Sequence, residues 1–247
     1  MILNLKAQCQ SLIGHKTSSA RSCIPHIFTL GNALCGYVSI IQSLEGNYTI
    51  AAYAIILAAV MDFLDGRIAR ALGVTSCIGM ELDSLCDAIS FCLAPTIMLY
   101  SSQAPMDTNL LLIALGCYLC AGLWRLARFN VTSAEQCAAF KGLPTTIAAF
   151  FMAAIIMAEP WFECYIQERA FYSALLICVI VLSYLMISAI PFPTFKNTQK
   201  KTMKICMLMV ACIIPVMAWF SYKGYPCLLV LMSGYIISSI ALRNKII

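Results

Sequence analysis

Charged side chains are scarce in this chain, because Asp, Glu, Lys and Arg together make up only 11% of its 247 residues. In an ordinary soluble domain they make up about 25%. Hydrophobic residues make up 62% of the chain, and the mean hydropathy is +0.87. The sequence has no P-loop, no Ser/His/Asp constellation, no internal repeat and no low-complexity tract, and its 14 cysteines follow no zinc-binding or disulfide spacing. These absences exclude a separate soluble domain, a P-loop nucleotide hydrolase and a triad hydrolase.

Apolar segments long enough to cross a bilayer recur along the chain. They predict an all-α integral membrane protein with about eight transmembrane helices. The expected spans are residues 27–44, 48–68, 80–100, 108–127, 143–159, 171–190, 204–221 and 225–242. We expect Pro95 to kink the third span, with a neighbouring helix satisfying the freed carbonyl. Residues 1–24 lack the pattern of a signal peptide and form either a short helix on the inner leaflet or a disordered tail.

Basic residues lie mainly on one side of these expected spans. If the N-terminus is cytoplasmic, only Arg169 and Lys223 of the 16 Lys and Arg residues lie outside the cell. Such an asymmetry is the usual topology signal of membrane proteins, so the net charge of +5 does not indicate nucleic-acid binding. We expect a multi-pass protein of the cell (inner) membrane with both termini in the cytoplasm.

The stretch Met61–Ala88, MDFLDGRIARALGVTSCIGMELDSLCDA, carries four aspartates inside apolar sequence. Asp62 and Asp65 are three residues apart, and Gly66 and Ala69 follow at helical spacing. At roughly 100° per residue, these four positions share an arc about 100° wide on one face of a helix. The small residues leave space beside the carboxylates where a ligand or a backbone segment can approach.

A second stripe follows after a short break, where Gly79, Asp83 and Asp87 recur every four residues. If the chain folds back at Val74–Thr75, the two stripes face each other and Asp62 comes level with Asp87. Four carboxylates then converge. With the topology given above, they lie at the cytoplasmic face of the membrane.

Four converging carboxylates repel one another and lose hydration in a membrane. The nearby side-chain cations, Arg67 and Arg70, are too few to neutralise them. Hard divalent ions, Mg²⁺ or Mn²⁺, bind carboxylate oxygens and keep positions open for phosphate. A pair of such ions about 4 Å apart is the usual clamp for an in-line displacement at phosphorus. We therefore expect two divalent cations here.

The spacing D-x-x-D-G-x-x-A-R, then eight residues, then G-x-x-x-D-x-x-x-D resembles the signature of the CDP-alcohol phosphotransferases. The matching positions are Asp62, Asp65, Gly66, Ala69, Arg70, Gly79, Asp83 and Asp87. The resemblance implies a six-helix core, which we place at residues 25–195, before a basic loop and two C-terminal helices over residues 196–247. It also implies a homodimer formed through the helices.

The same resemblance implies transfer of a phosphatidyl group from CDP-diacylglycerol to a small alcohol, with release of CMP. Asp62, Asp65 and Asp83 would hold the two ions. Asp87 would also contact a metal and would act as the base for the incoming hydroxyl group.

Donor binding is expected at two places. The cytidine would lie against small residues of the signature, and the arginine of the signature would support the phosphates. These positions are Gly66, Ala69, Arg70 and Gly79. Thr29, Asn32 and Gly36 share one face of the first span and either wall the nucleotide site or pack against another helix. His26 stands where phosphatidylserine synthases, which this span resembles, usually carry Asn, and we assign it no role.

Arg125 and Arg128 share a face at the cytoplasmic end of the fourth span, and Lys141 follows in the next loop. They form either an ordinary basic flank or an anion pocket, because guanidinium groups bind carboxylate and phosphate in a bidentate way. The runs RLARFN and FKGLP around them resemble phosphatidylserine synthases. The resemblance therefore favours L-serine as the acceptor, and we rank Arg128 first as the partner of its carboxylate.

Two alternatives stay open. Glycerol 3-phosphate or inositol as the acceptor would also use basic residues, and the metal motif does not choose among acceptors. A cation or proton transporter would also keep carboxylates in the membrane. Such sites usually lie near mid-bilayer between repeats, whereas these aspartates lie near the ends of their helices.

Overall fold

The computed structural model describes residues 20–74, 76–102, 108–134, 142–162 and 167–188. Across these residues the chain forms helices and short connections, without a strand. The helices are α2 (Ala20–Leu44), α3 (Tyr48–Leu72), α4 (Cys77–Asp87), the π-helical turn η1 (Ala88–Leu93), α5 (Ala94–Ser102), α6 (Thr108–Ala134), α7 (Thr145–Phe162) and α8 (Glu168–Ile187). The all-α class predicted from the sequence is confirmed.

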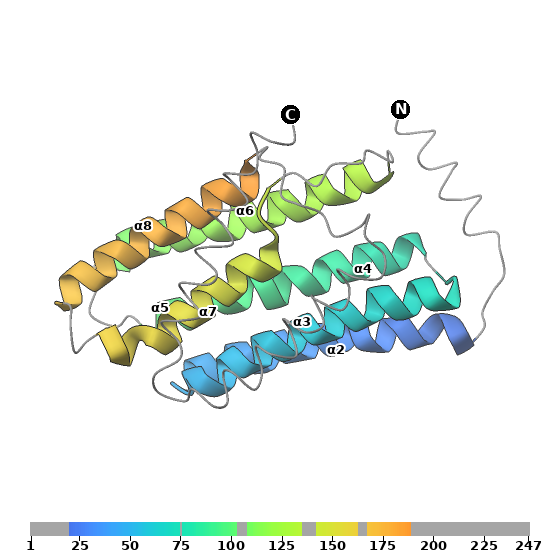
Figure 1. The fold of residues 1–247 in the computed structure, drawn as a ribbon, viewed down its shortest axis with the longest axis horizontal. Helices are drawn as coiled ribbons and strands as arrows, with labels where there is room; N and C mark the ends of the chain where they lie inside the picture. Colours follow the sequence, from blue (N-terminus) through green and yellow to red (C-terminus); the bar gives the residue numbers. More distant parts are fainter. Residues whose placement is uncertain (1–19, 75, 103–107, 135–141, 163–166, 189–247) are drawn as a thin grey trace, which may run out of the picture.

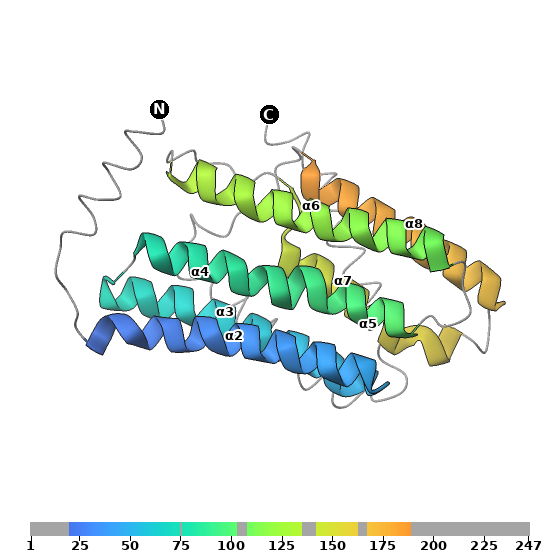
Figure 2. The same ribbon diagram turned by 180° about the vertical axis from the view of Figure 1, so that it is seen from behind.

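The helices run roughly along one axis and form a bundle (Figure 1). α2 and α3 pack against each other as antiparallel neighbours on one side, and α6 and α8 pack together on the opposite side. The α4–η1–α5 segment and α7 lie between these two pairs (Figure 2). The turn η1 touches all of α2 to α7, so residues next to η1 lie near the centre of the bundle.

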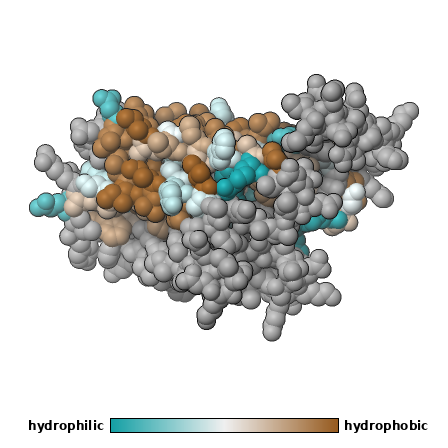
Figure 3. All heavy atoms as spheres, turned by 90° about the horizontal axis from the view of Figure 1, so that it is seen from above, coloured by the Kyte–Doolittle hydropathy of each residue, from teal (hydrophilic) through white to brown (hydrophobic). Residues whose placement is uncertain are grey.

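The bundle has the apolar lengths and surfaces of an integral membrane protein. The helical stretches long and apolar enough to cross a membrane are Cys23–Leu44, Tyr48–Leu72, Ile78–Ser102, Asn109–Val131 and Ala170–Ile187. The apolar stretch of α7, Thr145–Pro160, is shorter. Apolar side chains face outward, as Ile27 and Leu34 do, and much of the coloured surface in Figure 3 is hydrophobic. The expected spans 204–221 and 225–242 lie outside the described residues.

The first helix begins earlier than its apolar pattern suggested. α2 starts at Ala20, so it includes residues 20–24 of the expected N-terminal segment, and Pro25 lies inside the helix. Pro25 is beyond the first turn, and because it has no N–H, the Arg21 carbonyl lacks the donor that a regular α-helix would supply. Residues 1–19 are not among those described.

Local sequence determines the tight turn between α3 and α4. Gly73 has a φ of 65°, in the left-handed region that favours glycine, and the Val74 N–H donates to the Ala69 carbonyl at 3.0 Å. The Ser76 hydroxyl oxygen then accepts a hydrogen bond from the Gly79 N–H at 3.0 Å and caps the start of α4. The predicted fold-back between the two aspartate stripes is confirmed.

A proline explains the irregular helix that follows α4. Pro95 lies in α5 and has no N–H, so the Phe91 carbonyl loses the donor that an α-helix would supply. Tyr118 of α6, which is fully buried, donates its hydroxyl proton to this carbonyl at 3.2 Å. The neighbouring helix thus satisfies the freed carbonyl, as predicted, and the helix widens at η1 immediately after Asp87.

Candidate active site

Three aspartates meet where the α3–α4 hairpin faces the centre of the bundle. One carboxylate oxygen from each of Asp62, Asp83 and Asp87 lies within 4.8 Å of the other two. All three side chains are partly buried. Asp62 comes from α3 and the other two from α4, so the convergence predicted from the two stripes is confirmed for these residues.

Asp65 lies beside this cluster and is more deeply buried, with 5% of its surface exposed. It is close enough to interact electrostatically with Asp62 and Asp83. Within the described part of the chain, Asp65 Oδ2 and Asp83 Oδ1 are buried and have no hydrogen-bond partner. Buried carboxylate oxygens in this state are unfavourable unless a cation binds them.

The donor set fits a hard divalent cation. It consists of carboxylate oxygens from the three clustered aspartates and from the neighbouring Asp65, and two of these oxygens are buried without a hydrogen-bond partner among the described residues. Oxygen ligands of this kind suit Mg²⁺ and Mn²⁺, whereas zinc and copper sites usually use His or Cys. The structure therefore provides an acidic cluster suited to metal binding.

Helix α2 closes one side of the cluster with two buried polar residues, Thr29 and Asn32. The Asn32 amide donates from Nδ2 to Asp87 Oδ1 at 2.9 Å. The Thr29 hydroxyl donates to the carbonyl four residues earlier at 3.1 Å and lies close to the Asp65 carboxylate. The face expected to wall the nucleotide site thus borders the aspartates, and Asn32 makes its direct contact with one of them.

Gly66 of α3 leaves a space that the signature arginine covers. The Arg70 guanidinium lies over Gly66, with Nη1 3.7 Å from the point where a Cβ atom would stand. Arg70 is exposed and close enough to Asp65 to interact with its charge. Ala69, next to Arg70, is half-buried. The arrangement places a cation and small residues at the edge of the acidic cluster.

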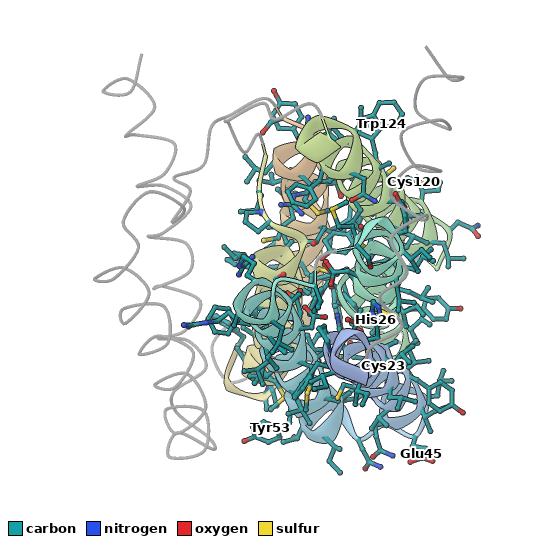
Figure 4. The ribbon with its side chains drawn as sticks, turned by 90° about the vertical axis from the view of Figure 1, so that its right-hand side faces the viewer. Cys23, His26, Glu45, Tyr53, Cys120 and Trp124 are labelled. Atoms are coloured by element: carbon teal, nitrogen blue, oxygen red, sulfur yellow. The ribbon has the colours of Figure 1, made fainter. Side chains whose placement is uncertain are left out.

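His26 also lies at the site, although no role was expected for it from its place in the sequence. Its ring lies over Gly79, with Cε1 3.1 Å from the point where a Cβ atom of that glycine would stand. The imidazole is also close enough to Asp65 to interact electrostatically. Figure 4 labels His26 on α2. His26 comes three residues before Thr29, so extending the polar stripe of the first span by one turn would have included it.

Arg125 of α6 faces the acidic cluster. Its side chain is 7% exposed, and it is close enough to Asp87 to interact with its charge. Nη1 donates to the Thr145 hydroxyl oxygen at 3.3 Å, and Nε has no hydrogen-bond partner within the described residues. A buried guanidinium with an unused donor next to carboxylates is a candidate for binding an anionic ligand.

Arg128, one turn further along α6, points toward the end of α8. Its Nη1 donates to the Ile187 carbonyl at 2.9 Å, and Nη2 contacts the carbonyls on either side at 3.4 and 3.5 Å. Gly142, with a φ of 91°, lets the loop before α7 approach, because a Cβ atom there would stand 2.8 Å from Arg128 Nη2. These contacts favour Arg125 over Arg128 as the anion-binding arginine. Lys141 lies outside the described residues.

Comparison with known proteins agrees with this geometry. The family model described as CDP-alcohol phosphatidyltransferase matches residues 22–183. This match covers more than half of the chain, which therefore belongs to that family, as the signature indicated.

Curated relatives match a similar length of the chain. The CDP-diacylglycerol–serine O-phosphatidyltransferase of Bacillus subtilis is 31% identical over 176 residues, which are 70% of this chain and 92% of the relative. The archaetidylserine synthase of Methanothermobacter thermautotrophicus is 34% identical over 174 residues, 69% of each chain. A Helicobacter pylori protein with the same name as the Bacillus one is 28% identical over 176 residues, 71% of this chain and 73% of the relative.

Proposed function

We propose that this protein transfers the phosphatidyl group of CDP-diacylglycerol to L-serine, forming phosphatidylserine and releasing CMP. The observation that carries the proposal is the gathering of Asp62, Asp83 and Asp87 within 4.8 Å in a chain of this family. The names of the Bacillus and Helicobacter relatives support CDP-diacylglycerol as the donor and serine as the acceptor.

The four aspartates form the proposed metal site. Two divalent cations, Mg²⁺ or Mn²⁺, bound there would neutralise the donor diphosphate and the charge that develops on the departing CMP. Asp65 and Asp83 each have a buried oxygen without a hydrogen-bond partner among the described residues, which supports the inclusion of both with Asp62 and Asp87.

The reaction is an in-line displacement at the phosphorus that carries diacylglycerol. The serine hydroxyl oxygen forms a bond to this phosphorus while the bond to the bridging oxygen of CMP breaks, and CMP leaves with that oxygen. Asp87 accepts the proton of the serine hydroxyl group. Its position between α4 and η1, close to both Asn32 and Arg125, supports this assignment.

The donor headgroup is held at the edge of the acidic cluster. Gly66, Ala69 and Gly79 let the cytidine lie close to the helix backbones when the Arg70 and His26 side chains that lie over the two glycines move aside. Arg70 then binds the phosphates. Thr29 borders the same space from α2. The outward-facing apolar side chains place the bundle in the bilayer, so the acyl chains of the donor can stay in lipid while its headgroup reaches the aspartates.

Arg125 binds the carboxylate of serine in this proposal. It is buried, it lies near Asp87, and its Nε atom has no partner within the described residues. Arg128 is engaged by the carbonyls at the end of α8, and Lys141 is a second candidate for contact with the acceptor. Glycerol 3-phosphate and inositol are the alternative acceptors, because a phosphate or a polyol would also bind near these cations.

The site faces the cytoplasm in this proposal, with both chain termini on that side. The asymmetry of Lys and Arg along the sequence supports this orientation. We place the family core at residues 25–195, and the family match over residues 22–183 supports this placement. A homodimer formed through the helices is part of the same proposal.

The test is an assay of CMP release by the purified protein with CDP-diacylglycerol, Mg²⁺ or Mn²⁺, and one acceptor at a time. We expect rapid turnover with L-serine and little with glycerol 3-phosphate or inositol. Turnover with glycerol 3-phosphate or inositol, and none with serine, would show that this alcohol and not serine is the acceptor. No turnover with any alcohol would overturn the enzymatic proposal and favour a transporter.

A further inference from the structure

Asn32 is the most completely buried polar residue that contacts the aspartates. It is 0% exposed, and Nδ2 donates to Asp87 Oδ1 at 2.9 Å. Within the described residues its own Oδ1 has no hydrogen-bond partner. The contact with Asp87 therefore determines how the amide is oriented, because turning it over would place two acceptor oxygens against each other.

The main chain of Asn32 is tied to the same region. The Ser90 hydroxyl of η1 donates to the Asn32 carbonyl at 2.9 Å. Gly36, one turn later on α2, has no side chain, and a Cβ atom there would stand 2.8 Å from Ser90 Cα. α2 thus contacts Ser90, three residues after Asp87, from two positions, while the Asn32 side chain contacts the Asp87 carboxylate itself.

We propose that Asn32 is a positioning residue for Asp87, and this proposal rests on the proposed function. An N–H that binds one oxygen of a carboxylate restricts its rotation and leaves the other oxygen available to the metals and to the serine hydroxyl group. The assignment replaces the contact with the donor nucleotide that the sequence suggested for Asn32.

Asn32 lies further from the expected donor-binding edge than Thr29 and His26 do, which supports a role in holding the aspartates and not the donor. Thr29 lies about 4.5 Å nearer the start of α2, given the rise of an α-helix. His26, about one turn nearer the start of α2 than Thr29, meets Gly79 at the expected donor-binding edge. Asn32 lies on the inner side of this edge, against Asp87.

The test compares kcat with KM in Asn32→Leu and Asn32→Asp, using CMP release with whichever alcohol the wild-type protein accepts. Asn32→Leu removes the donor at similar volume, and Asn32→Asp keeps the shape but replaces the donor with an acceptor. We expect kcat to fall about 10- to 100-fold in both variants, the range typical of lost partners to metal-site residues. KM for CDP-diacylglycerol should stay within about twofold of wild type, because the donor does not touch Asn32.

Ser43→Ala is the matched control on the same helix. Ser43 is equally buried, and its hydroxyl donates only to the Ser39 carbonyl of its own helix, at 2.6 Å. Its kcat should equal that of wild type. All rates are divided by the amount of folded protein measured by size-exclusion chromatography, so that misfolding does not imitate a loss of kcat.

Mn²⁺ titration followed by electron paramagnetic resonance gives a readout besides activity. We expect Asn32→Leu to bind the same number of Mn²⁺ ions as wild type, since every aspartate is retained. A raised donor KM with normal kcat would overturn the proposal in favour of nucleotide contact, and normal kcat in either variant would reduce Asn32 to a packing role. Failure of the proposed function looks different, because the wild-type protein itself would then release no CMP.

Discussion

The site has an acidic side, formed by the aspartates of the α3–α4 hairpin, and a basic side, formed by the arginines of α6. The two sides differ in which parts of the chain bring their residues into contact. On the α3–α4 hairpin, Asp62 and Asp87 meet because a tight turn brings two helical stripes face to face. On α6, Arg125 and Arg128 share a helix face but bond to different segments, 20 and 59 residues further along the chain. Regular spacing therefore predicts a cluster within one hairpin, whereas the roles of residues on one face depend on what packs against it.

The largest expected effect comes from the acidic side. Asp87→Asn should lower kcat by about 10²–10⁴-fold, because the variant has no carboxylate to accept the proton. The measurement is CMP release under saturating substrates. The matched control is Glu81→Gln, since Glu81 is an exposed acid of the same helix whose partner is Asn130. Near-normal kcat in Asp87→Asn would remove Asp87 as the base.

The next largest expected effect concerns Arg125, whose guanidinium group faces the aspartates. Arg125→Ala should raise KM for serine about 10- to 100-fold, the effect of losing a charged hydrogen-bond partner. KM for CDP-diacylglycerol should change much less. Steady-state kinetics with each substrate varied in turn makes this comparison. A larger rise in KM for the lipid donor would assign Arg125 to the donor phosphates.

Arg128→Ala should act on stability. The variant loses the hydrogen bonds that join α6 to the carbonyls at the end of α8, and we expect a loss of about 1–2 kcal/mol, because the contact is partly exposed. Thermal unfolding in detergent measures this loss. A KM for serine that rises as much as in Arg125→Ala would restore Arg128 as the carboxylate partner and remove the contrast between the two arginines.

The smallest expected effect concerns Tyr118, which hydrogen-bonds to the turn η1 that follows the α3–α4 hairpin. Tyr118→Phe removes the hydroxyl that satisfies the Phe91 carbonyl, and we expect a loss of about 1 kcal/mol. For a protein of this size this corresponds to a fall of about 2–4 °C in Tm. Met98→Leu, a substitution of another fully buried side chain at similar volume, serves as a packing control and should cost less. A Tm equal to wild type in Tyr118→Phe would show that the freed carbonyl needs no donor.

Local rules predicted much of the acidic side from sequence. The spacing of the aspartates, the glycine at the turn and the missing N–H of Pro95 all act within a few residues or along one helix. The sequence did not reveal that Arg128 binds the carbonyl of Ile187, since that contact requires the relative placement of α6 and α8. It also did not reveal that His26 lies over Gly79, because only the packing of α2 against α4 joins them.

The most direct test of the central claim is Mn²⁺ binding to the purified protein, followed by electron paramagnetic resonance. The account predicts about two bound Mn²⁺ ions per chain, as expected for a two-metal phosphoryl-transfer site. It also predicts that the double variant Asp62→Asn, Asp83→Asn loses this binding while remaining folded by size-exclusion chromatography. A wild-type protein that binds no Mn²⁺, or a double variant that binds as much as wild type, would contradict the account.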